Sequence, residues 1–450
     1  MHIAMIGAGY VGLVSATCFA DFGHDVVCVD KDPNRLNALR NGKIPIYEPG
    51  LEDLVKSNAD ASRLRFGDDV GAATRDADIV FLAVGTPSRH GDGYADLTYV
   101  YEAAREIAPH LSGFTVVVTK STVPVGTGDE VERIIADTNP AAECAVVSNP
   151  EFLREGSAIE DFRKPDRIIV GTDDDRAKSI MGQVYGALCA GNAPILFVGR
   201  RTAELTKYAS NAFLAMKITF INEMADLCER VGADVLSVAR GMGMDERIGD
   251  RFLQAGPGYG GSCFPKDSTA LTNMAQDSDS PLRLVETTVA INDQRRRAMA
   301  RKVIRACGGR VRGRRIGILG LTFKPDTDDM REAPSIPIIR TLLDAGAVIR
   351  AYDPAVIAAT HHTLREIEFC DDPYAVAEDA IALTVITDWD EFRSLDLERL
   401  CRQMDPASTV LVDLRNMFNP EQATEAGFAY EAVGRGNLGW DRTAVKHAAE

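Results

Sequence analysis

One cysteine of the chain lies in a setting that suits a reactive thiol. Cys263 follows the stretch 256–261, which contains four glycines, and Lys266 and Asp267 come just after it. Glycines let a backbone approach a ligand closely and adopt positive φ. A thiol on such a loop, beside a cation and a carboxylate, is a usual arrangement for a cysteine nucleophile. The alternative is a glycine-rich loop with a buried structural cysteine, and this stretch alone leaves both open.

A second pattern with chemical meaning stands at the start of the chain. The apolar run 2–6 predicts a short buried strand, a glycine-rich turn follows, and a helical stretch extends to about Phe22. Residues 26–29 predict a second strand that ends at Asp30. Such a turn lets a pyrophosphate reach the helix N-terminus, while the acid accepts hydrogen bonds from a ribose. The turn is formed by Gly7, Gly9, Tyr10, Val11 and Gly12.

The charges near this turn bear on the choice of dinucleotide. Asp30 favours NAD over NADP, because a 2′-phosphate would meet its carboxylate. Lys31 and Arg35 follow closely enough to soften that preference. The sequence therefore predicts a dinucleotide site with NAD as the cofactor.

Polar turns follow three more of the predicted strands. In open parallel sheets, ligands bind beyond the carboxyl ends of the strands, so we expect these turns to lie at a ligand site. The strands 78–84, 115–119 and 145–148 lead into the turns 85–87, 120–124 and 149–156. Two later strands, 167–171 and 194–198, complete the first domain.

The pattern then becomes helical, over 202–230 and again over 281–306, with the cysteine loop between. New strands begin at residue 315, after which a degenerate glycine turn indicates no second dinucleotide site. The predicted fold class is α/β, with two Rossmann-like doubly wound domains joined by a central helical segment with a long connecting helix. The predicted domains are 1–200, 201–306 and 307–450.

Two polar residues of the first long helix share one of its faces. Lys207 and Asn211 are four residues apart, which places them one above the other on a helix. The spacing alone is compatible with a functional pair or with an ordinary solvated face.

Composition narrows the possible partners and compartment. A net charge of −16 counts against nucleic acid or an anionic membrane as a partner. No apolar run approaches the ~20 residues that span a bilayer, and the strand at residues 2–6 leaves no room for a signal peptide. The nine cysteines show neither CxxC pairs nor metal-ligand spacing. We therefore expect a cytoplasmic protein with reduced thiols and no metal site.

Taken in order, the motifs resemble the UDP-glucose/GDP-mannose dehydrogenase family over nearly the whole chain. The resemblance rests on residues 7–13, 47–51, 120–124, 149–156, 203–211, 258–267 and 323–332. It implies oxidation of the C6 alcohol of a nucleotide sugar to a carboxylate, in two hydride transfers that each use a fresh NAD. UDP-glucose is the implied substrate, with GDP-mannose or a UDP-N-acetylhexosamine as the alternative. A homodimer or higher homo-oligomer is also implied.

The resemblance also assigns chemical roles. Cys263 is implied as the nucleophile, because an aldehyde has no second hydride to give until a thiolate adds to it. Lys207 and Asp267 are assigned to the alkoxide and to proton transfer, and Asn211 to the developing oxyanion. Thr122 and Glu155 are assigned to the positioning of a catalytic water.

Binding residues carry over in the same way. Beyond the glycine-rich turn, Asp30, Lys31 and Arg35, the implied NAD-binding residues are Thr86, Thr122, Glu155, Lys266 and Arg331. The implied substrate-binding residues are Glu151, Phe152, Leu153, Arg154, Glu155, Lys207, Asn211, Arg247, Phe252, Gly258, Tyr259, Gly260, Cys263, Phe323, Lys324 and Arg415. Arg247 matches an arginine lent across a dimer interface. The alternative for Lys324 and Arg331 is a solvated charge cluster with Asp326, Asp328 and Asp329.

Overall fold

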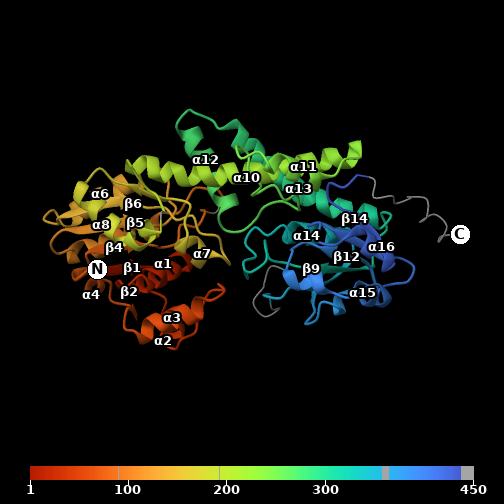
Figure 1. The fold of residues 1–450 in the computed structure, drawn as a ribbon, viewed down its shortest axis with the longest axis horizontal. Coiled ribbons are helices and arrows are strands. Elements are labelled where there is room, and N and C mark those ends of the chain that lie inside the picture. The colour runs from red at the N-terminus through yellow and green to blue at the C-terminus, as the bar shows by residue number, and fades with distance from the viewer. Residues whose placement is uncertain (90, 192, 357–363, 437–450) are drawn as a thin grey trace. The chain divides into compact units, whose positions relative to one another are not determined.

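Alternating strands and helices build two separate sheets in the computed structural model, which describes residues 1–89, 91–191, 193–356 and 364–436 (Figure 1). The chain divides into two compact units. The first unit comprises Met1–Ser210 with Thr269–Ser280, and the second comprises Asn211–Ser268 with Pro281–Glu450.

The first sheet has eight strands in the order β3-β2-β1-β4-β5-β6-β7-β8. All neighbours are parallel except β6 and β7, which pair antiparallel through Ser148 and Gly171. The order reverses direction between β1 and β4, which is where open α/β sheets bind their ligands. The strands are β1 (His2–Ile6), β2 (Asp25–Val29), β3 (Leu64–Gly67), β4 (Ile79–Leu82), β5 (Thr115–Thr119), β6 (Cys144–Ser148), β7 (Ile168–Gly171) and β8 (Ile195–Val198).

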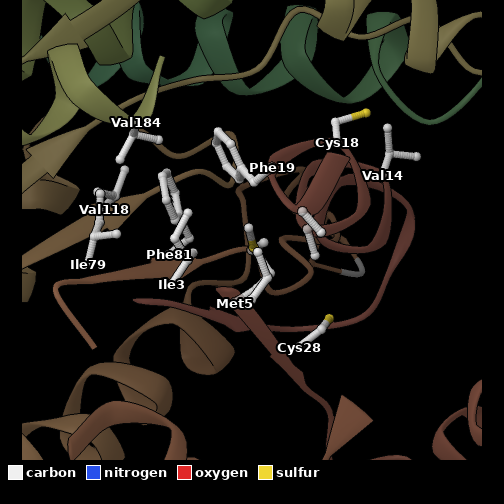
Figure 2. Packing of buried hydrophobic residues seen from close by; sticks show 14 of the residues in the cluster. Ile3, Met5, Val14, Cys18, Phe19, Cys28, Ile79, Phe81, Val118 and Val184 are labelled. Carbon is white, nitrogen blue, oxygen red and sulfur yellow. The ribbon is translucent and has the colours of Figure 1, made fainter. Parts of the chain in front are cut away.

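Both faces of this sheet are buried under helices. Side chains alternate along each strand, so Met5 belongs to the cluster on one face while its neighbour Ala4 belongs to the other. In the first cluster, the Phe19 ring stacks on Phe81 with ring centroids 5.0 Å apart (Figure 2). Helices α1 (Tyr10–Asp21), α2 (Pro33–Arg40), α3 (Leu51–Asp60), α7 (Ala158–Arg163), α8 (Asp175–Val184) and α9 (Gly186–Ala190) cover this face. Helices α4 (Val70–Arg75), α5 (Thr98–Ile107) and α6 (Thr127–Thr138) cover the other.

The second sheet repeats the same order with six parallel strands, β11-β10-β9-β12-β13-β14. Helices α14 (Ser335–Asp344), α15 (Leu397–Gln403) and α16 (Pro420–Glu425) accompany it. The strands are β9 (Arg315–Leu319), β10 (Val348–Tyr352), β11 (Glu368–Phe369), β12 (Ala380–Val385), β13 (Val410–Asp413) and β14 (Ala429–Ala432).

Four helices fill the sequence between the two sheets. They are α10 (Arg200–Val231), α11 (Val235–Gly243), α12 (Phe264–Asp277) and α13 (Arg283–Ala306). With its 32 residues, α10 is the predicted long connecting helix. The predicted α/β class, with two Rossmann-like sheets and a helical middle segment, is confirmed. Within the described ranges, no helix is both long and apolar enough to cross a membrane.

The two sheets also share one backbone detail. After β1, the Ala8 amide donates to Oδ2 of Asp30, which follows β2, over 2.7 Å. After β9, the Leu321 amide donates to Oδ2 of Asp353, which follows β10, also over 2.7 Å. In each half, therefore, a carboxylate at the end of the second strand holds the turn that follows the first.

Candidate functional site

The turn after β1 leaves room for a ligand where its middle glycine stands. A Cβ on Gly12 would lie 1.9 Å from the Gly7 carbonyl oxygen, so the packing of α1 on the turn already requires glycine there. A Cβ on Gly9 would meet no atom within 4 Å. No side chain caps α1, so its first N–H groups are available to an anion. The geometry fits a pyrophosphate that approaches over Gly9.

Asp30 is held as an ionised acceptor beside this turn. Its Oδ1 accepts from the Asp32 amide at 2.9 Å, and its Oδ2 accepts from Ala8 and from Nη1 of Arg35, the latter at 2.9 Å. Burial alone would raise its pKa, but these hydrogen bonds and the Arg35 charge hold the pKa below its usual value. A carboxylate has about four acceptor positions, so one remains for a ribose hydroxyl. Nζ of Lys31 forms an ion pair with Oε2 of Glu106 at 2.8 Å. Both nearby cations are thus paired with carboxylates, which suits NAD.

Asp30→Ala is expected to narrow the preference for NAD over NADP by about 10–100-fold, since a charged hydrogen bond contributes about 1.5–3 kcal/mol. The substitution removes the ribose acceptor and also releases Arg35, which can then pair with a 2′-phosphate. Calorimetric Kd values for both dinucleotides measure the change. Lys31→Met is the control and should leave the ratio unaltered. An unchanged ratio in Asp30→Ala would show that the carboxylate does not select the cofactor.

Tyr10 connects the glycine-rich turn to the turn after β6. Its hydroxyl donates to Oε2 of Glu48 and accepts from the Gly156 amide at 3.0 Å. Glu48 is buried and also accepts from the amides of Gly156 and Ala158, both at 2.7 Å. Burial raises the pKa of Tyr10 far above its usual value, and Glu48 raises it further, so the hydroxyl stays a donor. Tyr10 therefore positions the predicted substrate turn as well as belonging to the dinucleotide turn.

Lys207 and Glu151 form a buried ion pair in the first unit. Nζ of Lys207 lies 3.0 Å from Oε1 of Glu151, and the side chains are 4% and 6% exposed. Oε2 of Glu151 accepts from the Leu153 amide at 2.5 Å. Burial would raise the pKa of Glu151, but Lys207, the Leu153 amide and Lys120 lower it below its usual value. Lys207 also lies 5.2 Å from the centre of the Phe152 ring. Lys207 is thus a buried cation held over the predicted substrate turn, not part of a solvated face.

A second buried lysine lies close to this pair. Nζ of Lys120 donates to Oδ1 of Asn149 and to the Tyr185 hydroxyl, each at 3.1 Å. Burial lowers the pKa of Lys120 to about 8, while the charge of Glu151 acts in the opposite direction. Two lysines around one carboxylate make this part of the first unit electropositive, although the chain as a whole is acidic.

The other predicted residues of the first unit have varied surroundings. Oγ1 of Thr86 donates to the Thr122 carbonyl at 2.9 Å, which joins the turns after β4 and β5. Arg154 is exposed and pairs with Asp161 at 2.6 Å. Glu155 lies in the same turn as Glu151 and is half-buried. The structure therefore brings Glu151 of this turn to Lys207.

Cys263 stands directly before α12 in the second unit. Its carbonyl accepts from the Asp267 amide at 2.8 Å, which is the first bond of that helix. Asp267 is fully buried; Asn211 donates to its Oδ2 at 2.6 Å, and Lys266 lies 2.5 Å from its Oδ1. A helix N-terminus favours negative charge and so favours a thiolate over a thiol. The half-buried Cys263 thus lies at a helix N-terminus, beside a carboxylate with two donors.

The remaining predicted residues of the second unit surround this loop or lie at the surface. Phe252 has a φ of 65°, and its ring centroid is 6.0 Å from that of Phe264. Arg415 donates to the Phe323 carbonyl at 3.1 Å. Arg331 makes a two-pronged pair with Asp329, with both bonds at 2.8 Å. Arg247 is almost fully exposed and pairs with Asp245.

Sequence reasoning gave no role to Glu48 or Lys120, although both stand in stretches that carried the family resemblance. The signal for Lys120 was its position directly after a buried strand, where a charged side chain reaches the ligand edge of a sheet. Glu48 had no comparable signal, because its partners Tyr10 and Gly156 are distant in the sequence.

A glycine-rich turn that fits a pyrophosphate, in a chain that also has a cysteine at a helix N-terminus, is the arrangement expected of a nicotinamide-dependent dehydrogenase with a candidate covalent catalyst. Three models of the UDP-glucose/GDP-mannose dehydrogenase family match the chain: the NAD binding domain over residues 1–189, the central domain over 201–294 and the UDP binding domain over 317–420. The chain belongs to this family, and its cofactor is NAD.

Individual relatives agree with the family. The chain is 62% identical over 437 residues to the UDP-glucose 6-dehydrogenase of Rhizobium meliloti, with 97% of this chain and 100% of that protein covered. It is 44% identical to the UDP-glucose 6-dehydrogenase of Pseudomonas aeruginosa, with 98% of each covered. A UDP-glucose dehydrogenase structure from Pyrobaculum islandicum has a TM-score of 0.88 at 38% identity, covering 96% of this chain and 97% of that one.

Proposed function

We propose that the chain oxidises UDP-glucose to UDP-glucuronate, with two molecules of NAD reduced for each sugar. The placement of Cys263 at the start of α12 is the observation that carries the four-electron chemistry. The choice of UDP-glucose rests on the similarity to proteins named for that substrate, at 62% and 44% identity.

The chemistry divides into two oxidations and a hydrolysis. NAD, when bound, accepts the hydride that leaves C6. Lys207 stabilises the C6 alkoxide that forms as the alcohol loses its proton, because a cation placed at developing negative charge lowers the barrier. The Cys263 thiolate then adds to the aldehyde to give a thiohemiacetal, which loses the second hydride to become a thioester. Water hydrolyses the thioester, which releases the acid and restores the thiol.

The carboxylates and amide complete the assignment. Asp267 is buried with a hydrogen bond to each oxygen, so it is fixed in place as an acceptor for protons during these steps. Asn211 has a second amide hydrogen besides the one given to Asp267, and this hydrogen serves the oxyanion. Thr122 and Glu155 position the water, and Glu151 holds Lys207 in place.

A substrate panel tests the proposal. NADH formation is measured with UDP-glucose, UDP-N-acetylglucosamine, UDP-N-acetylmannosamine and GDP-mannose, each over a range of concentrations. The highest kcat/KM is expected for UDP-glucose. A higher kcat/KM for an N-acetylated sugar would favour the alternative substrate class. A UDP-D-ManNAc dehydrogenase structure from Pyrococcus horikoshii resembles this chain with a TM-score of 0.85 at 25% identity.

The active form proposed is a homodimer in the cytoplasm, in which Arg247 completes the substrate site of the partner subunit. The proposal is supported by the side chain of Arg247, which is 89% exposed and pairs with Asp245, so it is accessible to a partner subunit. All nine cysteines are free thiols, which suits a reducing compartment.

Mixing an Arg247→Ala chain with a Cys263→Ala chain is expected to restore activity, because one of the two sites in the heterodimer is then intact. Each variant alone should be inactive or strongly impaired. Turnover is measured after subunit exchange, and exchange itself is followed with a tagged chain. Proven exchange without recovery of activity would contradict a shared site.

A further inference from the structure

The cysteine loop is fitted tightly against the loop that follows β9. A Cβ on Gly260 would lie 2.3 Å from the Glu332 carbonyl oxygen, and a Cβ on Gly261 would lie 2.8 Å from the Phe323 ring. The Gly261 amide also donates to the Arg331 carbonyl at 2.9 Å. Only glycine allows this approach, so the two loops of the second unit fix each other's position.

Helix α13 also contacts both the cysteine loop and the loop after β9. Nη2 of Arg296 donates to the Tyr259 carbonyl at 2.7 Å, and its Nη1 donates to Oε2 of Glu332 at 3.1 Å. Asn292, one turn earlier, accepts from the Tyr259 amide at 2.9 Å and donates to the Tyr259 carbonyl at 3.1 Å. One guanidinium therefore bridges the cysteine loop and the loop after β9.

The bridge has two features that packing alone does not require. The Arg296 side chain is 7% exposed, whereas the Glu332 side chain that it binds is 62% exposed, so a buried charge is directed to a residue at the surface. Glu332 also has a φ of 50°, which is uncommon for a residue other than glycine, asparagine or aspartate. Backbone strain of this kind persists where the surrounding contacts impose it.

We propose that Arg296 is a positioning residue for the reaction, which sets the cysteine loop in register with the loop 323–332. The inference rests on the proposed function, in which Cys263 attacks an aldehyde formed from a sugar nucleotide that Phe323 and Lys324 help to bind. Without the bridge, the thiol and the loop 323–332 lose their fixed spacing. A displacement of about 1 Å can lower a rate on the order of 100-fold. Hydride removal from the alcohol needs no thiol, so the second oxidation suffers more than the first.

The test is the stoichiometry of NADH to UDP-glucose in Arg296→Met. The unmodified enzyme should give two NADH per sugar. In Arg296→Met we expect acid formation to fall on the order of 10–100-fold, with the ratio dropping below two and free aldehyde appearing. A purely structural role lowers the number of folded molecules but leaves two NADH for each sugar that the folded ones consume. The ratio therefore separates positioning from stability.

Two further variants and a control complete the experiment. Arg296→Lys keeps the charge but reaches one partner at a time, so its ratio should lie between those of Arg296→Met and the unmodified enzyme. Arg297→Met removes a neighbouring exposed cation of the same helix and should keep a ratio of two. The rate at which iodoacetamide alkylates Cys263 should change in Arg296→Met and not in Arg297→Met.

The outcomes separate the two proposals. If Arg296→Met does not fold, the ratio of Arg296→Lys decides. A ratio of two in every Arg296 variant that folds would overturn the positioning role. An unmodified enzyme that gives one NADH per UDP-glucose would instead overturn the proposed function, whatever the Arg296 variants do.

Discussion

With NAD in excess, Cys263→Ala is expected to form almost no UDP-glucuronate while UDP-glucose and NAD still bind. The substitution removes the nucleophile that converts the aldehyde into a species with a second hydride, but it leaves the first hydride step and the diphosphate contacts intact. Mass spectrometry of the nucleotide sugars after complete reaction measures the products. Burst kinetics at 340 nm show whether one NADH per enzyme still forms.

Cys189→Ala is the matched control, because Cys189 is an exposed thiol on α9. It should behave as the unmodified enzyme does. Cys18 and Cys28 are unsuitable nucleophiles, since burial raises the pKa of Cys18 to about 12 and that of Cys28 further. Near-normal UDP-glucuronate formation by Cys263→Ala would mean that the thioester route is wrong and that the loop cysteine is structural.

Lys207→Ala is expected to slow the first hydride transfer itself by ~10²–10³-fold, because the cation that stabilises the alkoxide is lost. It should also destabilise the fold, since removal of one partner of a buried ion pair costs about 3–5 kcal/mol. Single-turnover measurement of NADH on folded enzyme isolates the rate, and thermal unfolding measures the stability. The two variants are therefore expected to fail at different steps. Cys263→Ala completes the first oxidation but not the second, whereas Lys207→Ala is already slow in the first.

The double variant Lys207→Ala with Glu151→Gln separates the two effects. It removes the buried charge that Lys207→Ala leaves unpaired, so stability should recover in part while the hydride rate stays low. Glu151 is ionised in the folded protein, with its pKa lowered, so its contribution to stability is present above the unfolded pKa and is lost as the pH falls through the folded value. If the double variant regains the rate as well, Lys207 acts on stability and not on the alkoxide.

The strands were predictable because both faces of each sheet are buried. A fully covered parallel strand is a continuous apolar run, as at residues 79–84, and the helices between strands show the helical period. The dinucleotide turn was predictable because its spacing is fixed by the ligand. The antiparallel pairing of β7 with β6 was not, because an apolar run such as 168–171 has the same pattern in either direction.

The partners of the charged residues could not be predicted either. Tyr10 meets Glu48 from 38 residues away, and Asn211 meets Asp267 from 56 residues away. Local sequence sets where a side chain lies along a helix or turn, but only the packed structure decides which opposite charge it meets. The sequence predicted that Asn211 contacts the substrate and Lys266 the NAD. In the structure, both side chains also donate hydrogen bonds to the Asp267 carboxylate.

The acids that follow β2 and β10, Asp30 and Asp353, have equivalent positions in the two sheets but different hydrogen-bond partners. Asp30 keeps an acceptor position open, whereas Oδ2 of Asp353 also accepts from the Thr322 hydroxyl and the Trp389 indole, both at 3.1 Å. In the second half, the chain's own donors occupy the acceptor position that stays open on Asp30. No single substitution reverses this, because the hydroxyl and the indole must both leave before the carboxylate is open. The carboxylate of Asp353 is therefore an internal brace for its turn, whereas that of Asp30 can still accept from a ligand.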